Sequence, residues 1–339
     1  MELLQILWYM LWSLLWCIYF SLDGFDFGSA IAMPFIAKNE DERKLVLTTF
    51  GPFWDGNEVW LITAGGVAFA AFPIAYASMF SWFYVPIFIV LLSLIVRGFS
   101  VELRGKVKNR KLFDLLIFTS SLMAIFLFGV LWGNLWSAVD IRDEGYSNGM
   151  SGLLNLTGIL TGVFFTVVFL IYGLIWLLNK IEGVLKYEVY TFFKKVWYIG
   201  LVLYLLFLIF NPLFKNPNYK LELINGKIAT IFYIFSMILF FISKLFIDRQ
   251  RYLKGFFSYF VFILFIVGGQ FAGNFPNLIA AKNPQFNITA FNSSSSFYTL
   301  KLMLIVVLIF IPLVIFYQIW VYRVFRDKIT IGDIKNEYY

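Results

Sequence analysis

Four carboxylates stand within long apolar stretches of the chain, where a charged side chain is unexpected. Asp23 and Asp26 are three residues apart, and Asp55 and Glu58 have the same spacing, which places both members of each pair on one face of a helix. Ionisable groups at bilayer depth cost a few kcal/mol or more, and they commonly mark an ion or proton pathway. Carboxyl groups gathered in a poorly solvated place repel one another, so some of them are expected to hold protons near neutral pH. The four residues are therefore predicted to pass protons.

Arg97 is the candidate charge partner of these acids, because it stands at the end of a third apolar stretch. A structural explanation competes with the proton pathway: each acid would pair with a nearby base or cap a kinked helix, and Glu102 with Arg104 would extend the polar cluster. That explanation competes most strongly at Asp26 and Glu102 and least at Asp55. The two explanations are compatible, because an ion-paired carboxylate can still lie on a proton path.

The composition places these residues in a membrane protein. Of 339 residues, 61% are hydrophobic, 21% are aromatic and only 14% are charged, whereas soluble globular chains are about 45–50% apolar and about 25% charged. This balance excludes a disordered chain, a disulfide-stapled secreted domain and a nucleic-acid-binding protein. The chain has no histidine and a single cysteine, Cys17, so it lacks the common ligands of zinc and haem iron and the commonest general base. No metal or redox cofactor is expected on this chain, and redox chemistry here would need ligands from another chain.

Nine stretches are long and apolar enough to cross a bilayer, which takes about 20 residues per helix. They cover residues 3–37, 45–72, 76–96, 113–136, 153–178, 196–214, 228–243, 256–275 and 300–322. The predicted fold is an all-α polytopic membrane protein of nine transmembrane helices, with residues 1–339 forming a single transmembrane helical domain. The first stretch is longer than one crossing requires, so its second half is expected to project beyond the hydrocarbon or to run along protein. It has no basic n-region and no A-x-A-like site, which predicts a retained helix.

The positive charges predict the orientation, since cytoplasmic loops retain Lys and Arg. The loops after stretches one, three, five and seven and the C-terminal tail hold 21 of the 27 Lys and Arg residues. This bias predicts an N-terminus outside and a C-terminus in the cytoplasm, which needs an odd number of spans. Both acid pairs then lie in the cytoplasmic halves of adjacent helices. Asp23 follows about 20 residues of the first helix, and Asp55 lies about ten residues, roughly 15 Å, into the second.

Glycine, tryptophan and serine patterns indicate packing rather than chemistry. Several G-x-x-x-G motifs, among them residues 24–28, favour a close approach of helices. Three tryptophans recur at helical spacing and are expected to face lipid or to pack at an interface rather than to hold a cofactor: Trp8, Trp12 and Trp16. The outer loop 274–299 is long enough to cover something, and its serine run 293–296 indicates local flexibility, with a plain connector as the alternative.

One long string of residues resembles a known family. Residues 51–66 read Gly-Pro-Phe-Trp-Asp-Gly-Asn-Glu-Val-Trp-Leu-Ile-Thr-Ala-Gly-Gly, and residues 23–28 read Asp-Gly-Phe-Asp-Phe-Gly. Both resemble subunit II of the cytochrome bd quinol oxidases, and the string G-P-x-W-D-G-N-x-V-W-L is too long and specific for a chance match. The resemblance continues in the shorter segments 69–73, 97–106, 133–134 and 328–334. Spans five to eight match only in character.

The resemblance implies a nine-helix subunit without haem that packs against a haem-bearing subunit I of similar architecture in a heterodimer. Subunit I is expected to hold two b-type haems and one d-type haem and to oxidise quinol near the outer surface. The complex would reduce oxygen to water with protons from the cytoplasm, in the cytoplasmic membrane of a bacterium or archaeon. Subunit I, quinol, oxygen and membrane lipid are the implied partners, and nucleic acid is not. A bound quinone, a small accessory peptide and the choice between ubiquinol and menaquinol are left open.

Individual residues of the motifs carry implied roles. Asp55 resembles the aspartate on the proton path to the haems, with the first acid pair near its entrance. Trp60 matches the position that lines a proposed oxygen route from the lipid, and Arg97 matches an arginine at the cytoplasmic end of the third span. Phe53 stands where many relatives place histidine, so it is left out of the path.

Two other classes of protein compete with this interpretation. A proton-coupled secondary transporter could use the same acids of helices 1 and 2, but such folds often show two internal repeats with broken helices, and no matching half is found. An assembly or structural membrane protein without transport is the third hypothesis. Colour distinguishes them, because the purified complex should show the absorbance of b- and d-type haems while this chain alone should be colourless.

Overall fold

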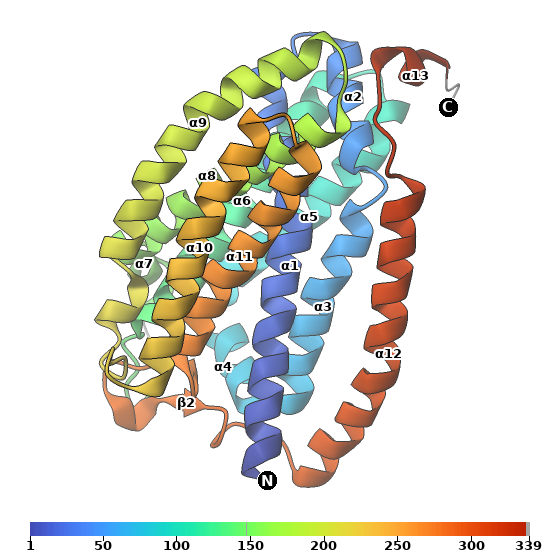
Figure 1. Cartoon of the computed structure of the whole chain (residues 1–339). Coiled ribbons are helices and arrows are strands. Elements are labelled where there is room, and N and C mark those ends of the chain that lie inside the picture. The colour runs from blue at the N-terminus through green and yellow to red at the C-terminus, as the bar shows by residue number, and fades with distance from the viewer. Residues whose placement is uncertain (147, 337–339) are drawn as a thin grey trace.

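The computed structural model describes residues 1–146 and 148–336, and it is a bundle of long helices with short connections (Figure 1). Helices dominate because in lipid every backbone N–H and C=O must find a partner within the segment itself. In the first part of the chain the elements are α1 (Glu2–Ile36), α2 (Glu40–Phe50), α3 (Trp54–Ala71), α4 (Pro73–Trp82), α5 (Tyr84–Leu103), the 3-10 turn η1 (Arg104–Lys106) and α6 (Arg110–Ser137). The remaining elements are α7 (Gly149–Leu153), α8 (Leu156–Lys180), α9 (Val184–Ile209), η2 (Pro212–Lys215), α10 (Ile224–Asp248), α11 (Tyr252–Asn274), β1 (Asn277–Ile279), η3 (Pro284–Phe286), β2 (Ile288–Thr289), α12 (Phe297–Val324) and α13 (Ile331–Asn336).

Within the described residues, eight helices are long and apolar enough to cross a membrane, and the number is nine if α3 and α4 are taken as one bent span. This confirms the predicted all-α polytopic membrane fold. The start of α1 and helix α13 lie at opposite ends of the bundle (Figure 1), as an odd number of crossings requires. The assignment of these two ends to the outside and the cytoplasm stays a prediction from the charge distribution.

The second predicted span, 45–72, differs from the observed helices. Residues 51–53 form a turn that separates α2 from α3, and Pro52 within it has no N–H to donate to a continuous helix. Asp55 therefore lies in the first turn of α3, whereas the prediction placed it about ten residues inside a continuous helix.

The third predicted span, 76–96, is also divided. α4 follows α3 at a bend of 118°, and Phe83 separates it from α5. Pro73 stands at the start of α4, where a missing N–H costs nothing because the first turn of a helix has no internal acceptors for its N–H groups. The span that follows the bend begins at Tyr84 with α5.

Helix α1 contacts α3, α6, α8 and α11 and is the central element of the bundle (Figure 1). Its second half is buried almost throughout, so the overlong first span runs along protein, which was one of the two predicted outcomes. α1 and α8 meet at Gly28 and Gly173. A Cβ atom added at Gly28 would lie 1.7 Å from the carbonyl oxygen of Phe169, so only glycine fits. The close approach predicted for the motif 24–28 is confirmed.

The tryptophan stripe of α1 lies inside the bundle. Trp8 and Trp12 are 0% and 2% exposed, and Trp12 and Trp16 both pack against Trp132 of α6, with ring centroids 5.8 and 4.9 Å apart. The Trp8 indole Nε1 donates a hydrogen bond to the backbone oxygen of Leu300, at 3.0 Å. The packing role is confirmed, and the alternative that these rings face lipid is wrong for Trp8 and Trp12.

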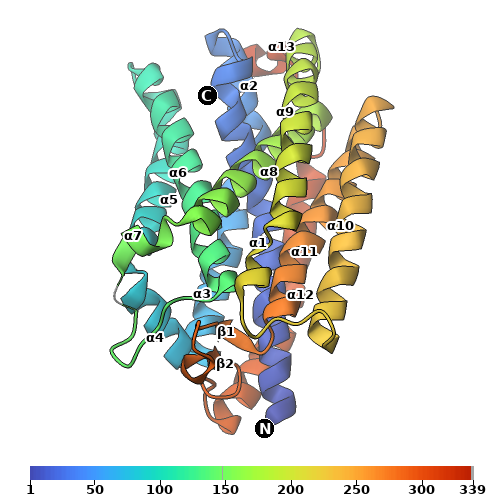
Figure 2. The ribbon, with the colours of Figure 1, turned by 90° about the vertical axis from the view of Figure 1, so that its left-hand side faces the viewer.

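The loop 274–299, between α11 and α12, lies over the end of the bundle at which α1 begins (Figure 2), and β1 and β2 pair antiparallel within it. The last two residues of its serine run, Ser295 and Ser296, bind the ends of two helices. The Ser295 N–H and hydroxyl donate to the backbone oxygens of Ala71 and Ala70, at 2.9 and 2.7 Å, and so satisfy carbonyl groups left over at the end of α3. The Ser296 side chain caps the start of α12. The local flexibility predicted for this run stays a prediction.

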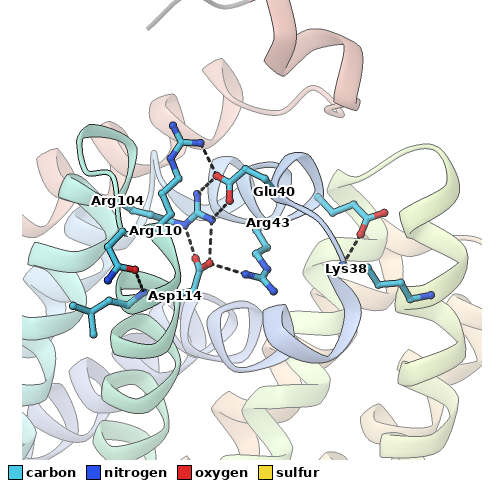
Figure 3. A network of polar contacts seen from close by, with 9 residues as sticks. Lys38, Glu40, Arg43, Arg104, Arg110 and Asp114 are labelled. Atoms are coloured by element: carbon cyan, nitrogen blue, oxygen red, sulfur yellow. Dashed lines mark hydrogen bonds and ion pairs between the residues drawn. The ribbon is translucent and has the colours of Figure 1, made fainter.

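A network of charged side chains fastens α2 to the start of α6 (Figure 3). Arg104 Nη1 and Nη2 donate to the two carboxylate oxygens of Glu40, at 2.9 and 3.0 Å, and Arg104 Nε donates to Asp114. Arg43 binds Asp114 at 3.0 Å and Arg110 binds Glu40 at 2.9 Å. Two-pronged contacts of this kind are among the stronger hydrogen bonds in proteins. Arg104 thus belongs to this network, which we call the Arg104 clamp. The alternative from the sequence, in which Arg104 extends the polar cluster around Arg97, is wrong.

The segment after α12 is attached to the end of α8. Ile329 N donates to Lys180 O at 2.8 Å, and Glu182 N donates to Ile329 O at 3.2 Å. Lys180 Nζ donates to the backbone oxygen of Asp327 at 3.3 Å, and Lys328 forms an ion pair of 2.7 Å with Glu182. In α12, no residue of the most apolar stretch is buried within this chain, and these contacts hold the segment that follows its C-terminal end.

Candidate functional site

Two of the predicted acids converge on Arg97 toward the end of the bundle that carries α2 and α13. Arg97 Nη2 lies 2.7 Å from Asp23 Oδ1 and 2.7 Å from Glu58 Oε1. The side chains of Asp23 and Arg97 are 0% and 1% exposed, and that of Glu58 is 20% exposed. The ring of Phe27 lies against the guanidinium, with Arg97 Cζ 3.9 Å from its centroid. Arg97 is therefore the charge partner of one acid from each of the first two spans.

Three helices supply this cluster, which we call the carboxylate cluster: Asp23 and Asp26 from α1, Glu58 from α3 and Arg97 from α5. If all were ionised, three carboxylates and one guanidinium would leave a net charge of −2. A proton on one carboxyl group lowers the mutual repulsion in a place that water solvates poorly. The cluster has the composition of a group that accepts and releases protons.

Asp26 is bound by an amide and not by a cation. Asn57 Nδ2 donates to Asp26 Oδ2 at 2.7 Å and to the backbone oxygen of Leu22 at 3.1 Å. The Asn57 side-chain oxygen accepts from Gln318 Nε2 at 2.8 Å and from the Tyr322 hydroxyl at 3.2 Å. Two side chains of α12 thereby reach the carboxylate cluster through α3.

Several buried polar atoms around the cluster have no hydrogen-bond partner within residues 1–146 and 148–336. They are Asp23 Oδ2, Asp26 Oδ1, Arg97 Nε and Nη1, Tyr19 Oη and Ser100 Oγ. Buried polar groups are almost always satisfied, and internal water is the usual partner where protein offers none. The cluster is therefore suited to hydration, and carboxyl groups linked by water are the ordinary components of a proton path.

Asp55 does not join the cluster. Its side chain is exposed at the surface of the chain, one helical turn before Glu58, and it forms no ion pair with a described residue. Glu102 is exposed as well. The four predicted acids therefore do not form one group. Asp23, Asp26 and Glu58 lie around Arg97, whereas Asp55 lies on the exposed surface of α3.

Trp60 lies between α3 and α12, where it is 3% exposed and its Nε1 donates to Gln318 Oε1 at 3.3 Å. A separate cavity of about 230 Å³ lies among α1, α3, α4, α5 and α6, and its walls are almost wholly apolar. The residues that line it include Trp12, Trp16, Leu61, Ala68, Phe83 and Trp132. Trp60 does not line this cavity, so the position predicted for an oxygen route and the apolar cavity near it are distinct.

Sequence reasoning missed three members of the site: Asn57, Gln318 and Tyr322. A signal was present for Gln318, which is the only amide in the apolar stretch 300–322, and an isolated amide in a membrane helix calls for a hydrogen-bond partner. Asn57 stood inside the quoted motif without an assigned role. Neither residue could be paired with the other from the sequence, because α3 and α12 are more than 200 residues apart.

No group of three or more His, Cys, Asp or Glu side chains arranged to hold a metal ion occurs in the described part of the chain. With no histidine in the sequence, a haem iron would have to take the usual imidazole ligand from another chain.

The bundle and its cluster define an integral membrane protein that buries ionisable side chains within its spans, a class in which such groups serve ion or proton transfer. The family of cytochrome bd terminal oxidase subunit II matches residues 4–325, and this chain belongs to that family. Membership makes it a subunit of an oxidoreductase complex and gives no support to the transporter hypothesis.

Individual relatives cover nearly the whole chain. It is 34% identical over 337 residues to cytochrome bd ubiquinol oxidase subunit 2 of Bacillus subtilis (strain 168), with 97% of this chain and 98% of the relative covered. It is 27% identical over 373 residues to cytochrome bd-I ubiquinol oxidase subunit 2 of Escherichia coli (strain K12), with 99% and 97% covered. A structure of bd oxidase from Geobacillus thermodenitrificans matches with a TM-score of 0.76 over 95% of this chain and 98% of that chain, at 14% identity. This last comparison shows a shared fold.

Proposed function

We propose that this chain is the proton-delivering, non-haem subunit of a bd-type quinol oxidase in a bacterial or archaeal cytoplasmic membrane. Protons taken from the cytoplasm would pass through it to the place where the complex reduces oxygen to water. The observation that carries the proposal is the convergence of Asp23 and Glu58 on the buried Arg97, with Asp26 beside them. Buried charges in membrane helices are costly, and a purely structural link between helices would not need an excess of carboxylates.

The geometry suggests a direction for the transfer. The carboxylate cluster lies toward the end of the bundle that the charge distribution assigns to the cytoplasm, so protons would enter near Asp23 and Asp26. Glu58, which is partly exposed, connects the interior to the surface of α3. Asp55, which is exposed one helical turn before Glu58, would transfer the proton to the neighbouring subunit.

The exposed position of Asp55 also indicates where subunit I packs. An ionisable side chain directed at lipid costs several kcal/mol, so the surface of α3 around Asp55 should be covered by protein. α12 flanks the same region through its contacts with α3, and its apolar length is not buried by this chain. The face made by α3 and α12 is therefore the proposed contact with subunit I.

The redox centres of the complex would lie on that partner. We expect subunit I to hold two b-type haems and one d-type haem, and quinol and oxygen to react there. In this arrangement the present chain binds and moves protons but makes no bond to oxygen.

The proton pathway can be tested in the assembled two-subunit complex with Asp26→Asn and Asp55→Asn. Both variants should assemble with normal haem content but consume oxygen about 10- to 100-fold more slowly, because a neutral amide cannot carry a proton. Asp143→Asn is the matched control, since Asp143 is exposed in a loop beyond the far end of α6. Normal turnover and an unchanged pH dependence in both Asp26→Asn and Asp55→Asn would refute the pathway.

A second function, access of oxygen from the membrane, is favoured by the apolar cavity of about 230 Å³. Oxygen is small and apolar and partitions into such spaces. If oxygen passes this way, Ala68→Phe should fill part of the cavity and raise the KM for oxygen with little change in the maximal rate. Ile238→Phe on the exposed surface of α10 is the control. A raised KM in Trp60→Phe but not in Ala68→Phe would instead place the route beside Trp60.

A further inference from the structure

The hydrogen bonds of Asn57 determine how its amide is oriented. Asn57 is 0% exposed, and its nitrogen faces two acceptors, Asp26 Oδ2 and Leu22 O, while its oxygen faces two donors, Gln318 Nε2 and the Tyr322 hydroxyl. An amide nitrogen only donates and an amide oxygen only accepts. The four contacts therefore permit one orientation, in which Asn57 donates to Asp26.

The orientation of Gln318 is determined in the same way, one step further out. The Trp60 indole can only donate, and it donates to Gln318 Oε1 at 3.3 Å. The other end of the Gln318 amide is thus left to donate to Asn57, at 2.8 Å. Trp60, Gln318, Asn57 and Asp26 form a chain of hydrogen bonds in which every donor points toward the carboxylate.

We propose that Asn57 is a positioning residue for proton transfer at Asp26, and that Gln318 of α12, oriented by Trp60, holds it in place. The inference rests on the proposed proton pathway and deepens it by assigning different tasks to the two acids of α1. Asp23 is bound by a permanent cation, Arg97, at 2.7 Å. Asp26 is bound by a neutral amide, which favours the ionised carboxylate less strongly than a guanidinium does. Asp26 is therefore the acid that exchanges its proton.

The other charged and titratable groups that face Asp26 do not replace Asn57. They come from α1, α3, α5, α8 and α12, and they are Asp23, Glu58, Arg97, Tyr172 and Tyr322. Arg97 and the two tyrosines donate no hydrogen bond to Asp26 in the described structure. Asp23, which contacts Asp26, and Glu58 could donate only when protonated, whereas Asn57 donates at 2.7 Å in every protonation state. Loss of the Asn57 amide would leave the Asp26 carboxylate without a permanent donor.

The same chain of bonds connects the acid to the proposed subunit interface. α12 lies on the face that subunit I would cover, and its side chains Gln318 and Tyr322 are its polar links to Asn57. A displacement of α12 by one hydrogen-bond length would break the bonds that Gln318 and Tyr322 donate to Asn57. Contact of subunit I with α12 would therefore help to keep α12 in the position that these bonds require.

The test compares Asn57→Leu and Gln318→Leu in the complete two-subunit complex. The first readout is the pH profile of oxygen consumption. The second is the carboxylic acid C=O band in redox-induced infrared difference spectra, assigned to Asp26 by its loss in Asp26→Asn. If Asn57 had only a structural role, its replacement would change neither the pH profile nor the position of the Asp26 C=O band. Gln270→Leu is the matched control, because Gln270 is another 0% exposed amide, hydrogen-bonded to Asn211 at 3.2 Å near the opposite end of the bundle.

In Asn57→Leu the profile should shift to alkaline pH by about one unit or more, because the lost N–H bond had favoured the ionised acid. The Asp26 C=O band should shift as well. Gln318→Leu should shift both readouts in the same direction by a smaller amount, since Tyr322 still donates to Asn57. Gln270→Leu should leave both unchanged. If Asn57→Leu does not assemble with its haem-bearing partner, the positioning role is judged from Gln318→Leu with the same two readouts.

The failure of this inference is distinguishable from the failure of the proton pathway. If Asp26→Asn removes the band and slows turnover while the Asn57 and Gln318 variants match the wild type, the positioning role is overturned and the pathway stands. If Asp26→Asn changes neither readout, the pathway through Asp26 is overturned, and the positioning role falls with it.

Discussion

Asp23 and Arg97 form a buried ion pair between α1 and α5, with 2.7 Å between Asp23 Oδ1 and Arg97 Nη2. The residues are 74 positions apart in the sequence, and neither side chain is more than 1% exposed. Each charge is therefore compensated mainly by the other and by neighbouring polar groups rather than by bulk water. Removing one partner leaves a buried charge alone, which is much more costly than replacing the whole pair with apolar side chains.

Arg97→Met should for this reason destabilise the chain by about 3–5 kcal/mol. We expect less assembled oxidase and a lower thermal midpoint, measured by the loss of haem absorbance on heating. Arg97→Met combined with Asp23→Leu should recover part of the stability, because the fully buried Asp23 charge is removed together with its partner and only Glu58, which is 20% exposed, loses its cation. A double variant that is less stable than Arg97→Met alone would contradict the argument.

Gly28→Ala should separate α1 from α8. The new Cβ atom would lie 1.7 Å from the backbone oxygen of Phe169, which cannot move without displacing its helix. Overpacking of this kind costs about 1–3 kcal/mol, and it should appear as faster proteolysis and a lower unfolding temperature in detergent. Gly105→Ala is the control, since no atom lies within 4 Å of its added Cβ; equal losses in the two variants would exclude the steric explanation.

The attachment of the C-terminal segment should weaken in acid. The hydrogen bond and charge of Lys328 lower the pKa of Glu182, in the exposed turn after α8. Because the folded pKa lies below the ordinary Glu value of about 4.3, the contact contributes stability above that value and loses it as pH falls through the lowered pKa. A spin label in Asp327→Cys should become more mobile as pH falls below about 4. In a Glu182→Gln background this pH dependence should disappear, and its persistence would mean that another group controls the segment.

Arg104→Lys should loosen α2 although the charge is kept. A single ammonium cannot reproduce the fork that binds both oxygens of Glu40 and reaches Asp114. The loss should be about 1–3 kcal/mol, seen as faster hydrogen exchange in α2. Lys38→Met, which removes the exposed pair with Glu188, should have no measurable effect on the same exchange. Comparable effects of the two changes would show that the clamp is no stronger than a surface ion pair.

The amino-acid sequence alone determined the class of protein, the approximate number of spans and the residues worth examining. These follow from local properties, because an apolar run of about 20 residues belongs in lipid whatever its neighbours are, and a carboxylate within such a run is costly in any arrangement. The same reasoning identified Arg97 as a counter-ion. The motif around Asp55 indicated the family, which the comparison over residues 4–325 established.

Only the tertiary structure decided how these residues are paired. In the structure Asp23 and Glu58 both bind Arg97, Asp26 accepts a hydrogen bond from Asn57, and Asp55 lies at the surface. Helical spacing shows which side chains share a face, but the helix that lies against that face depends on packing between segments as distant as α3 and α12. The hydrogen bonds of Ser295 at the end of α3 and the bend after α3 could likewise not be predicted from the sequence, because each requires contacts that form only once the helices have assembled.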